Sequence, residues 1–463
     1  MARSKKETAL TPEEHLQAAL VPDWEWPYKL PENWCWTRIG MVSNFERGIT
    51  FPAAAKEAAP TEDNIPCLRT ANVQENLEID DMIYVNRDFM KGNIAKLVRE
   101  NDIIMSSANS RELVGKSSLV THIPFPMTFG GFVLNIRAKK MSSKYLFYFL
   151  RHEFLAGKFI GESSQTTNIA NINTTTLGNY EIPLPPIPEQ QRIVDRIESL
   201  FAKLDEAKEK AQAVVDSFET RKAAILHKAF TGELTAKWRE EHGVRMESWE
   251  VRTLDSVCSS IFDGDHMPPP KAESGIPFLV ISNVNTGHLT FENTRFVPQE
   301  YYDTLSDTRK PQLGDVLYTL VGSFGIPVVV NSKRPFCFQR HMALLRPIDV
   351  SPQFLWYILQ TPEMYDKASS IATGTAQLTV PIKGLRAMTI PRPNIAEQVE
   401  IVRILDGFFA REQSAKEAAE AVLDQIDLMK KSILARAFRG ELGTNDPNEE
   451  SAVGLLKRGL EKK

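Results

Sequence analysis

The stretch that decides the fold is Ile182-Pro183-Leu184-Pro185-Pro186-Ile187-Pro188-Glu189-Gln190, because it returns as Ile390-Pro391-Arg392-Pro393-Asn394-Ile395-Ala396-Glu397-Gln398. The copies are 208 residues apart, and the register holds to Gly232-Glu233-Leu234 and Gly440-Glu441-Leu442. From Ile182 to Leu234, 25 of 53 ungapped positions are identical. A repeat of this size indicates the domain organisation more directly than any single predicted helix or strand. The chain therefore consists of two related halves, about 28–235 and about 246–443.

A fainter but ordered similarity precedes each copy. Ile65-Pro66 parallels Ile276-Pro277, and Asp102-Ile103 parallels Asp315-Val316. The offset drifts from 215 to 209 along these regions, so they carry insertions and share a fold rather than a sequence. The order is a globular head, a repeated segment, a second head and the second repeated segment.

The repeated segments have the spacing of long helices. After Glu189, apolar or small residues recur at alternating steps of four and three, a heptad seam that only Arg221 interrupts. The second copy keeps the phase and is broken at Glu412. The spacing predicts a helix of about 43 residues, roughly 65 Å long, in each half, ending at Gly232 and Gly440. Asn394 and Glu397 form a capping-box-like start for the second, and the proline-rich run before Glu189 blocks an earlier start for the first. A heptad alone is equally typical of a generic interaction coil.

The heads have the composition of mixed α/β domains. Short β-branched and aromatic runs bounded by turn residues predict strands, and two apolar runs predict one short buried helix in each head. The predicted strands are 79–85, 103–106, 278–281 and 316–320, and the predicted helices are 145–155 and 354–359. The predicted fold is thus two mixed α/β heads joined and separated by two long antiparallel coiled-coil helices, with a pseudo-twofold internal repeat. The predicted boundaries are 1–27 (N-terminal extension), 28–181 (head), 182–235 (helix), 236–389 (head), 390–443 (helix) and 444–463 (tail).

Composition places the chain among soluble multidomain proteins. It has 463 residues, 42% hydrophobic and 25% charged, with a net charge of -4. No stretch approaches the ~20 apolar residues of a membrane span, and the basic start leads into Glu13-Glu14 rather than an apolar signal region. We therefore expect a cytoplasmic protein without membrane contact. The four cysteines lie far apart, without zinc or disulfide spacing.

Local charge suggests a nucleic-acid partner. Residues 91–160 hold 11 Lys or Arg against 4 Asp or Glu, and the second head gathers Lys333, Arg334, Arg340, His341 and Arg346 around two phenylalanines. The loops 106–111 and 165–168 are rich in the amide and hydroxyl groups that read base edges. A solvated basic surface and ordinary turns are the alternatives for any one of these features. Their recurrence in both halves favours DNA or RNA.

Catalytic motifs are not evident in the sequence. Gly115-Lys116-Ser117 has Ser110 where a phosphate-binding loop needs glycine. Met267-Pro268-Pro269-Pro270 lacks both ends of the amino-methyltransferase motif, and Asp263-x-Asp265-His266 is better explained as a loop than as a metal site. We expect a non-catalytic chain that itself holds no cofactor and no metal.

The signatures 182–194 (IPLPPIPEQQRIV) and 431–442 (KSILARAFRGEL), with Trp238-Arg239 after the first helix, closely resemble type I restriction-modification specificity subunits over about residues 30–443. The resemblance implies that each head is a target recognition domain reading one half of a bipartite double-stranded DNA site. It implies that the helices set the spacer and dock two methyltransferase subunits, and that two motor-nuclease subunits complete the complex. S-adenosylmethionine, ATP and magnesium would belong to those partners.

Loop position and side-chain chemistry predict the DNA contacts. Arg and Lys favour guanine or phosphate, and Asn and Gln favour adenine. The predicted contacts of the first head are Arg47, Thr70, Asn72, Ser107, Asn109, Arg111, Lys116, Thr167 and Asn168. Those of the second head are His266, Lys271, Ser282, Asn283, Ser323, Arg340, His341 and Gln377. Two alternatives stay open: a two-headed coiled-coil adaptor protein without DNA recognition, and a self-contained methyltransferase-nuclease, against which the missing motifs speak.

Overall fold

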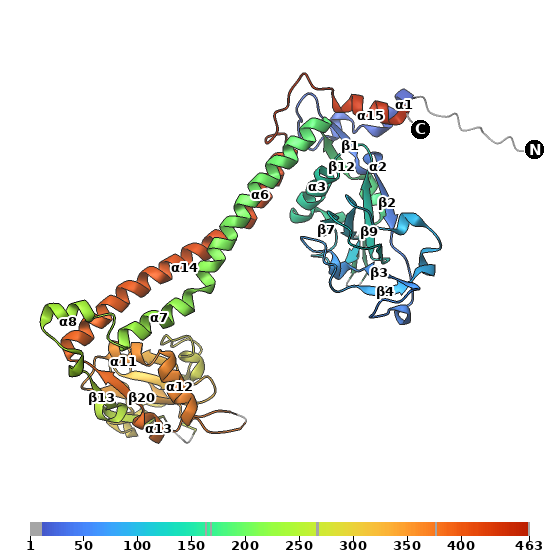
Figure 1. Cartoon of the computed structure of the whole chain (residues 1–463). Coiled ribbons are helices and arrows are strands. Elements are labelled where there is room, and N and C mark those ends of the chain that lie inside the picture. The colour runs from blue at the N-terminus through green and yellow to red at the C-terminus, as the bar shows by residue number, and fades with distance from the viewer. Residues whose placement is uncertain (1–11, 163, 167–168, 265–267, 376, 462–463) are drawn as a thin grey trace, which may run out of the picture. The chain divides into compact units, whose positions relative to one another are not determined.

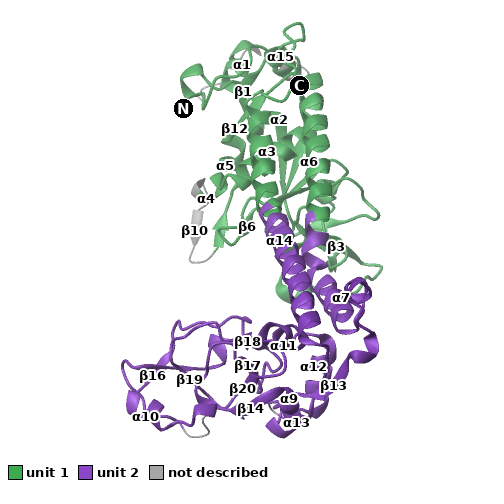
Figure 2. Cartoon of the chain, turned by 90° about the vertical axis from the view of Figure 1, so that its left-hand side faces the viewer, with its two compact units in different colours: residues 1–210, 422–463 green, residues 211–421 purple. Residues whose placement is uncertain are grey.

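The computed structural model describes residues 12–461 except 163, 167–168, 265–267 and 376. The chain divides into two compact units, one formed by residues up to 210 together with those from 422 onward, the other by 211–421 (Figures 1 and 2). Each unit thus contains one head and parts of both repeated segments.

The head of the first unit is built on two small sheets. A four-stranded antiparallel sheet has the order β2-β9-β5-β7, and a three-stranded sheet has the order β4-β3-β8, with β3 and β8 parallel. A third pair, β1 with β12, leads into the repeated helix, and β10-β11-β6 forms a further small sheet. The strands are β1 (Cys35–Arg38), β2 (Ser43–Arg47), β3 (Asn64–Leu68), β4 (Ile83–Asn86), β5 (Ile103–Ser106), β6 (Ala108–Asn109), β7 (Ser117–Leu119), β8 (Thr128–Phe129), β9 (Val133–Ala138), β10 (Ser164–Thr166), β11 (Ile169–Asn171) and β12 (Glu181–Leu184).

The head of the second unit repeats three of these four sheets with the same strand order, and its described residues contain no counterpart of the β10-β11-β6 sheet. Its sheets have the orders β14-β20-β17-β18, β16-β15-β19 and β13-β21, again with one parallel pair, β15 with β19. The faint similarity between the two upstream regions is therefore a shared fold, and the predicted mixed α/β class is confirmed. The strands are β13 (Glu250–Thr253), β14 (Cys258–Asp263), β15 (Ile276–Leu279), β16 (Arg295–Val297), β17 (Val316–Thr319), β18 (Pro327–Val329), β19 (Cys337–Phe338), β20 (Met342–Pro347) and β21 (Thr389–Arg392).

Helices pack against these sheets and form the repeated segments. The predicted buried helices are α3 and α11, and the N-terminal extension forms α1, which packs on α15 of the C-terminal tail. The helices are α1 (Pro12–Ala19), α2 (Ile39–Val42), α3 (Ser143–Leu155), α4 (Lys158–Glu162), α5 (Thr174–Asn179), α6 (Ile187–Asp216), α7 (Phe218–Phe230), α8 (Ala236–His242), α9 (Leu254–Val257), α10 (Gln299–Thr304), α11 (Pro352–Ile358), α12 (Pro362–Ile371), α13 (Ile382–Ala387), α14 (Ile395–Phe438) and α15 (Ala452–Glu461).

The two repeated segments differ in continuity. The second is one helix of 44 residues, α14, but the first is broken at Ser217 into α6 and α7, so the prediction of one long helix there is wrong. The Ser217 hydroxyl donates back to the carbonyl of Ala213, and the Arg221 guanidinium donates to the carbonyl of Val214 at 3.2 Å. Such back-bonding competes with the helical ladder. Helix α6 also begins two residues before Glu189, because proline fits the first turn of a helix.

The ends of both segments follow the prediction more closely. Gly232 and Gly440 take positive φ angles of 85° and 78°, as C-terminal glycines do. Asn394 accepts from the backbone N–H of Glu397 at 3.0 Å, which is half of a capping box. The Glu397 side chain is used elsewhere, so the reciprocal half is not formed.

The repeated segments pair in antiparallel fashion. In the first unit, Ile193 near the start of α6 shares a core with Leu434 near the end of α14. In the second unit, Leu226 near the end of α7 shares a core with Ile401 near the start of α14. The two polar interruptions of the heptads also meet in the second unit, where Arg221 Nε lies 2.7 Å from a carboxylate oxygen of Glu412.

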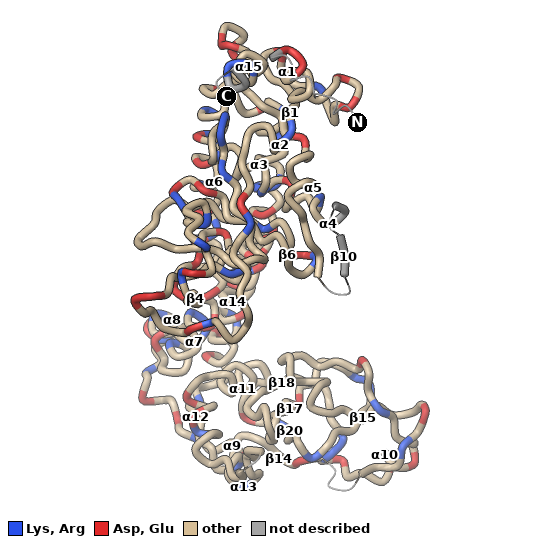
Figure 3. The backbone as a smooth tube through the Cα atoms, turned by 90° about the vertical axis from the view of Figure 1, so that its right-hand side faces the viewer, with Lys and Arg blue, Asp and Glu red and all other residues tan. Residues whose placement is uncertain are grey.

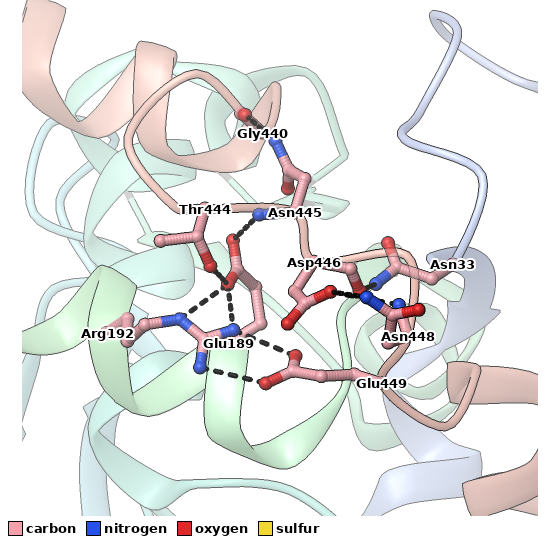
Figure 4. A network of polar contacts seen from close by, with 9 residues as sticks. All are labelled: Asn33, Glu189, Arg192, Gly440, Thr444, Asn445, Asp446, Asn448 and Glu449. Carbon is pink, nitrogen blue, oxygen red and sulfur yellow. Dashed lines mark hydrogen bonds and ion pairs between the residues drawn. The ribbon is translucent and has the colours of Figure 1, made fainter.

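A Glu-Gln motif at the start of each segment (Glu189-Gln190 and Glu397-Gln398) fixes the neighbouring chain. Glu189 is fully buried and accepts from Thr444, the backbone N–H of Asn445 and Arg192 (Figure 4). Glu397, also fully buried, accepts from Thr235 at 2.7 Å, Arg239 at 2.7 Å and Trp249 at 2.9 Å. Each glutamate therefore holds the segment that follows the end of the opposite helix.

The glutamines of the motif tie the helices to the heads. Gln190 accepts from the backbone N–H of Ser142 at 2.7 Å, which starts α3. Gln398 accepts from that of Ser351 at 2.9 Å, which starts α11. Both donate to a proline carbonyl five residues earlier at 2.9 Å. The same connection between head and helix is thus built twice.

Candidate nucleic-acid interface

Part of the predicted basic face has a structural role. Arg137 makes a two-pronged contact with buried Asp102 (2.7 and 2.8 Å), and Arg346 makes the same contact with buried Asp315 (3.1 and 2.9 Å). Both guanidinium groups also donate to a backbone carbonyl, of Leu97 and Lys310 respectively. Arg346, which the sequence pattern placed among the DNA-facing cations, is therefore part of a duplicated internal ion pair.

Other cations of the first head are also paired. Acidic residues neutralise four more of the eleven Lys and Arg side chains between 91 and 160, and three of those acids lie outside the segment that was counted. Figure 3 accordingly shows basic and acidic residues interleaved over both units. The excess of seven positive charges thus overstates the free charge of this head. The pairs are Lys96–Glu46, Lys144–Glu198, Arg151–Glu75 and Lys158–Glu153.

Two predicted contacts lie in the interior of their heads. Asn72 is buried, accepts from the backbone N–H of Arg69 at 2.7 Å and donates to the carbonyls of Glu78 and Asp81. Asn283 is buried and bridges the N–H of Val280 and the carbonyl of Glu292 in the same way. A buried polar group needs such partners, so these amides hold the loops after β3 and β15 in place. The prediction that they face DNA conflicts with their burial here.

The remaining predicted residues divide by exposure. Thr167, Asn168 and His266 lie outside the described residues. Thr70, Ser107, Asn109, Lys116 and His341 are half-buried. Arg47, Arg111, Lys271, Ser282, Ser323, Arg340 and Gln377 are exposed. Whether any of them touches DNA stays a prediction.

In the first head, several of these residues gather around a loop that sequence reasoning missed. The loop is Gly130–Phe132, between β8 and β9. Phe132 is 65% exposed, and its carbonyl accepts from both the backbone N–H (3.0 Å) and the hydroxyl (3.1 Å) of Ser107. Phe132 and Thr70 line one pocket of about 510 Å³. Arg47 ends β2 opposite Leu134 at the same end of the sheet.

The second head has the equivalent loop, Gln339–His341, between β19 and β20. Its carbonyl at His341 accepts from the backbone N–H of Leu320 at 2.8 Å, as that of Phe132 does from Ser107. Partial burial and the neighbouring Arg340 guanidinium lower the pKa of His341, so its imidazole is neutral at pH 7. The sequence pattern found Arg340 and His341 by their charge. Phe132 carries no such signal, and only the aligned strands reveal that it is the counterpart of His341.

Two further observations concern the described part of the chain. Among those residues, no three His, Cys, Asp or Glu side chains come together as a metal site. None of the described helices combines the length and apolar composition needed to cross a bilayer.

Comparison with known proteins assigns the chain to a family. The model of the type I restriction modification DNA specificity domain matches residues 31–215 and again 246–423, so that each match takes in one head and much of the helix that follows. The chain belongs to this family. The match occurs twice, in agreement with the internal repeat.

Similar proteins span almost the whole chain. The type I restriction enzyme EcoKI specificity subunit of Escherichia coli is 27% identical over 454 residues, covering 93% of this chain and 95% of that protein. The MjaVIII specificity subunit of Methanocaldococcus jannaschii is 24% identical and covers 91% and 95%. The crystal structure of the HsdS subunit from Thermoanaerobacter tengcongensis, 21% identical, matches 90% of this chain and 99% of that one with a TM-score of 0.61. The latter shows a shared fold.

Proposed function

We propose that this chain, a DNA sequence-specificity subunit by family, reads a bipartite target, with each head recognising one half of the site. The observation that carries the proposal is the duplication: two heads of one topology, each tied by the same Glu-Gln motif to an antiparallel helix pair. In the proposal the two repeats approach DNA in inverted orientations, which would suit the local dyad of the duplex. A helix of 44 residues is about 66 Å long at ~1.5 Å per residue, and such a rigid element would convert helix length into spacer length.

In this proposal the chain is not itself an enzyme. It works inside a restriction-modification complex with two methyltransferase subunits and two motor-nuclease subunits, in the cytoplasm. S-adenosylmethionine, ATP and magnesium are bound by those partners. The methyltransferase subunits take the target adenine out of the stack, since a base inside a duplex cannot be reached for chemistry. The specificity chain determines where on the DNA the complex binds.

The test is reconstitution with candidate methyltransferase subunits of the same host, followed by mapping of methylated adenines in genomic DNA. We expect one split motif. Arg111→Ala should reduce the discrimination between bases at no more than one position of the half-site read by the first head. Gln377→Ala should do the same in the half-site read by the second head. Each change should cost ~1–3 kcal/mol of discrimination at that position. Assembly without any motif would instead favour the two-headed adaptor.

Salt dependence gives a second readout. For a complex that neutralises phosphates, the logarithm of the DNA-binding constant falls linearly with the logarithm of the salt concentration. An adaptor without DNA contacts gives no such slope. If Arg111→Ala lowers affinity equally for every sequence and flattens the slope, then Arg111 contacts a phosphate rather than a base.

A further inference from the structure

The loops Gly130–Phe132 and Gln339–His341, here called the tip loops, rest on the same backbone platform in the two heads. The first residue of each loop donates to a β3 or β15 carbonyl, Gly130 to Leu68 at 2.9 Å and Gln339 to Leu279 at 3.1 Å. The same residue then accepts from the strand that follows, at 2.8 Å and 3.2 Å. Together with the bonds from Ser107 and Leu320, each loop is fixed at both of its ends.

The platform also requires a glycine at the end of the neighbouring strand. Gly48 and Gly264 donate to the carbonyls of Val133 and Met342, both at 3.2 Å. A Cβ on Gly48 would lie 2.0 Å from the carbonyl oxygen of Gly130, and one on Gly264 would lie 2.2 Å from that of Phe338. Only glycine permits this approach, so both heads have the same close crossing.

What differs between the tip loops is the chemistry they present. The first has Gly131 and Phe132, and the second has Arg340 and His341 at the same places. A single exposed phenyl ring is ordinary on a protein surface. An apolar tip and a basic tip on one rigid platform, in two heads that read different half-sites, is the arrangement expected of residues that set specificity. Rigid support is also what a base contact needs.

We propose that the tip loops read bases in the major groove, with Phe132 against the C5-methyl group of a thymine in the first half-site and Arg340 on a guanine in the second. An apolar side chain distinguishes thymine by its methyl group, and a guanidinium can bond the O6 and N7 atoms of guanine together. Neutral His341, beside Arg340, can donate to or accept from an adjacent base edge. This inference rests on the proposed function.

The test for Phe132 removes the methyl group from the DNA. The complete complex of this chain with its methyltransferase subunits is titrated with duplexes carrying the mapped target, in which each thymine of the first half-site is replaced in turn by uracil. With the unaltered chain, one uracil should weaken binding about fourfold, the value of one buried methyl group. With Phe132→Ala, that uracil should have no further effect. Phe125→Ala, an exposed phenylalanine (39%) in the loop before β8, is the matched control and should leave the uracil response intact.

The test for Arg340 is selection from duplexes with a randomised second half-site. Arg340→Ala should relax one G·C position by roughly 5- to 150-fold and leave the first half-site unchanged. Lys383→Ala removes an exposed cation on α13 of the same head, outside the basic patch, and is the control that should leave the preference unchanged. Because Phe132 and Arg340 are exposed, thermal melts of their variants should match that of the unaltered chain.

The outcomes distinguish a failure of the proposed function from a failure of the tip-loop inference. An unaltered complex without sequence preference refutes the proposed function itself. A normal preference with the same uracil response in Phe132→Ala, or a uniform loss of affinity in Arg340→Ala, refutes the tip-loop inference alone.

Discussion

Loss of the Glu397 carboxylate should destabilise the second unit more than loss of Glu189 destabilises the first. Glu397 is fully buried and is held by Thr235, Trp249 and Arg239, whose side chain is only 10% exposed. In Glu397→Ala the Arg239 guanidinium would keep its bonds to the carbonyl of Gly232 and to Thr235 but lose its counter-charge. An uncompensated buried charge costs about 3–5 kcal/mol.

The first unit provides the matched comparison. Arg192, the ion-pair partner of Glu189, is 35% exposed and is also bonded to Glu449 at 2.8 and 2.9 Å. In Glu189→Ala this cation keeps a carboxylate and access to water, and the main loss is the bonds to Thr444 and Asn445. That loss is about 1–3 kcal/mol. The two variants remove the same atoms from equivalent positions, so the difference of about 2 kcal/mol isolates the buried charge.

Hydrogen exchange of the full chain measures the two local free energies separately. The segment around Thr235 to Trp249 reports on Glu397, and the segment around Thr444 to Glu449 reports on Glu189. A double-mutant cycle with Arg239→Met should show coupling above about 1.5 kcal/mol, since Arg239→Met removes the charge that Glu397→Ala strands. Equal losses of protection in the two segments, or coupling near zero, would show that the buried charge of Arg239 does not dominate the cost of Glu397→Ala.

Three further predictions follow from other contacts. Arg221→Met should weaken the helix pair by about 1 kcal/mol because the Arg221–Glu412 pair is only partly buried, and the charge-swapped double variant Arg221→Glu with Glu412→Arg should recover most of that stability in chemical unfolding. Arg346→Ala should lower the melting temperature by stranding buried Asp315, at a cost of about 3–5 kcal/mol, while the sequence preference of the complex that still folds stays unchanged in binding selection. Burial raises the pKa of three thiols to about 12. Each thiol therefore stabilises the fold fully below pH 9 and loses that contribution as pH rises from 9 towards 12. Alkylation at pH 8 should modify these thiols only after unfolding, and rapid labelling of the native chain would contradict this. These thiols are Cys35, Cys67 and Cys258.

The sequence predicted best those features that depend on periodicity. Four features depend on spacing or on residues close together in the chain, and they are found as expected: the repeat, the strand 103–106, the C-terminal glycines and the long second helix. The break at Ser217 was missed because the apolar spacing continues across it, while a hydroxyl and a guanidinium bond backward to carbonyls. Composition also misjudged the basic face, because a count along the chain does not show that Glu46 or Glu198 lies beside a lysine in space. The sequence placed Asn72 in a loop but could not show that its amide points inward.

Duplication within one chain separates what the fold needs from what recognition can vary. The Asp–Arg pairs, the buried asparagines after β3 and β15, and the glutamines of the Glu-Gln motifs recur with equivalent partners, although much of the surrounding sequence of the heads has diverged. Their side chains are buried or internally bonded, so a change there disturbs the fold of a head whatever DNA it meets. The tip loops keep the same backbone bonds but exchange Phe132 for His341, and backbone bonds do not depend on the side chain. A head can therefore acquire a new base contact at this place without rebuilding its core, and this is the physical condition under which one fold reads two different half-sites.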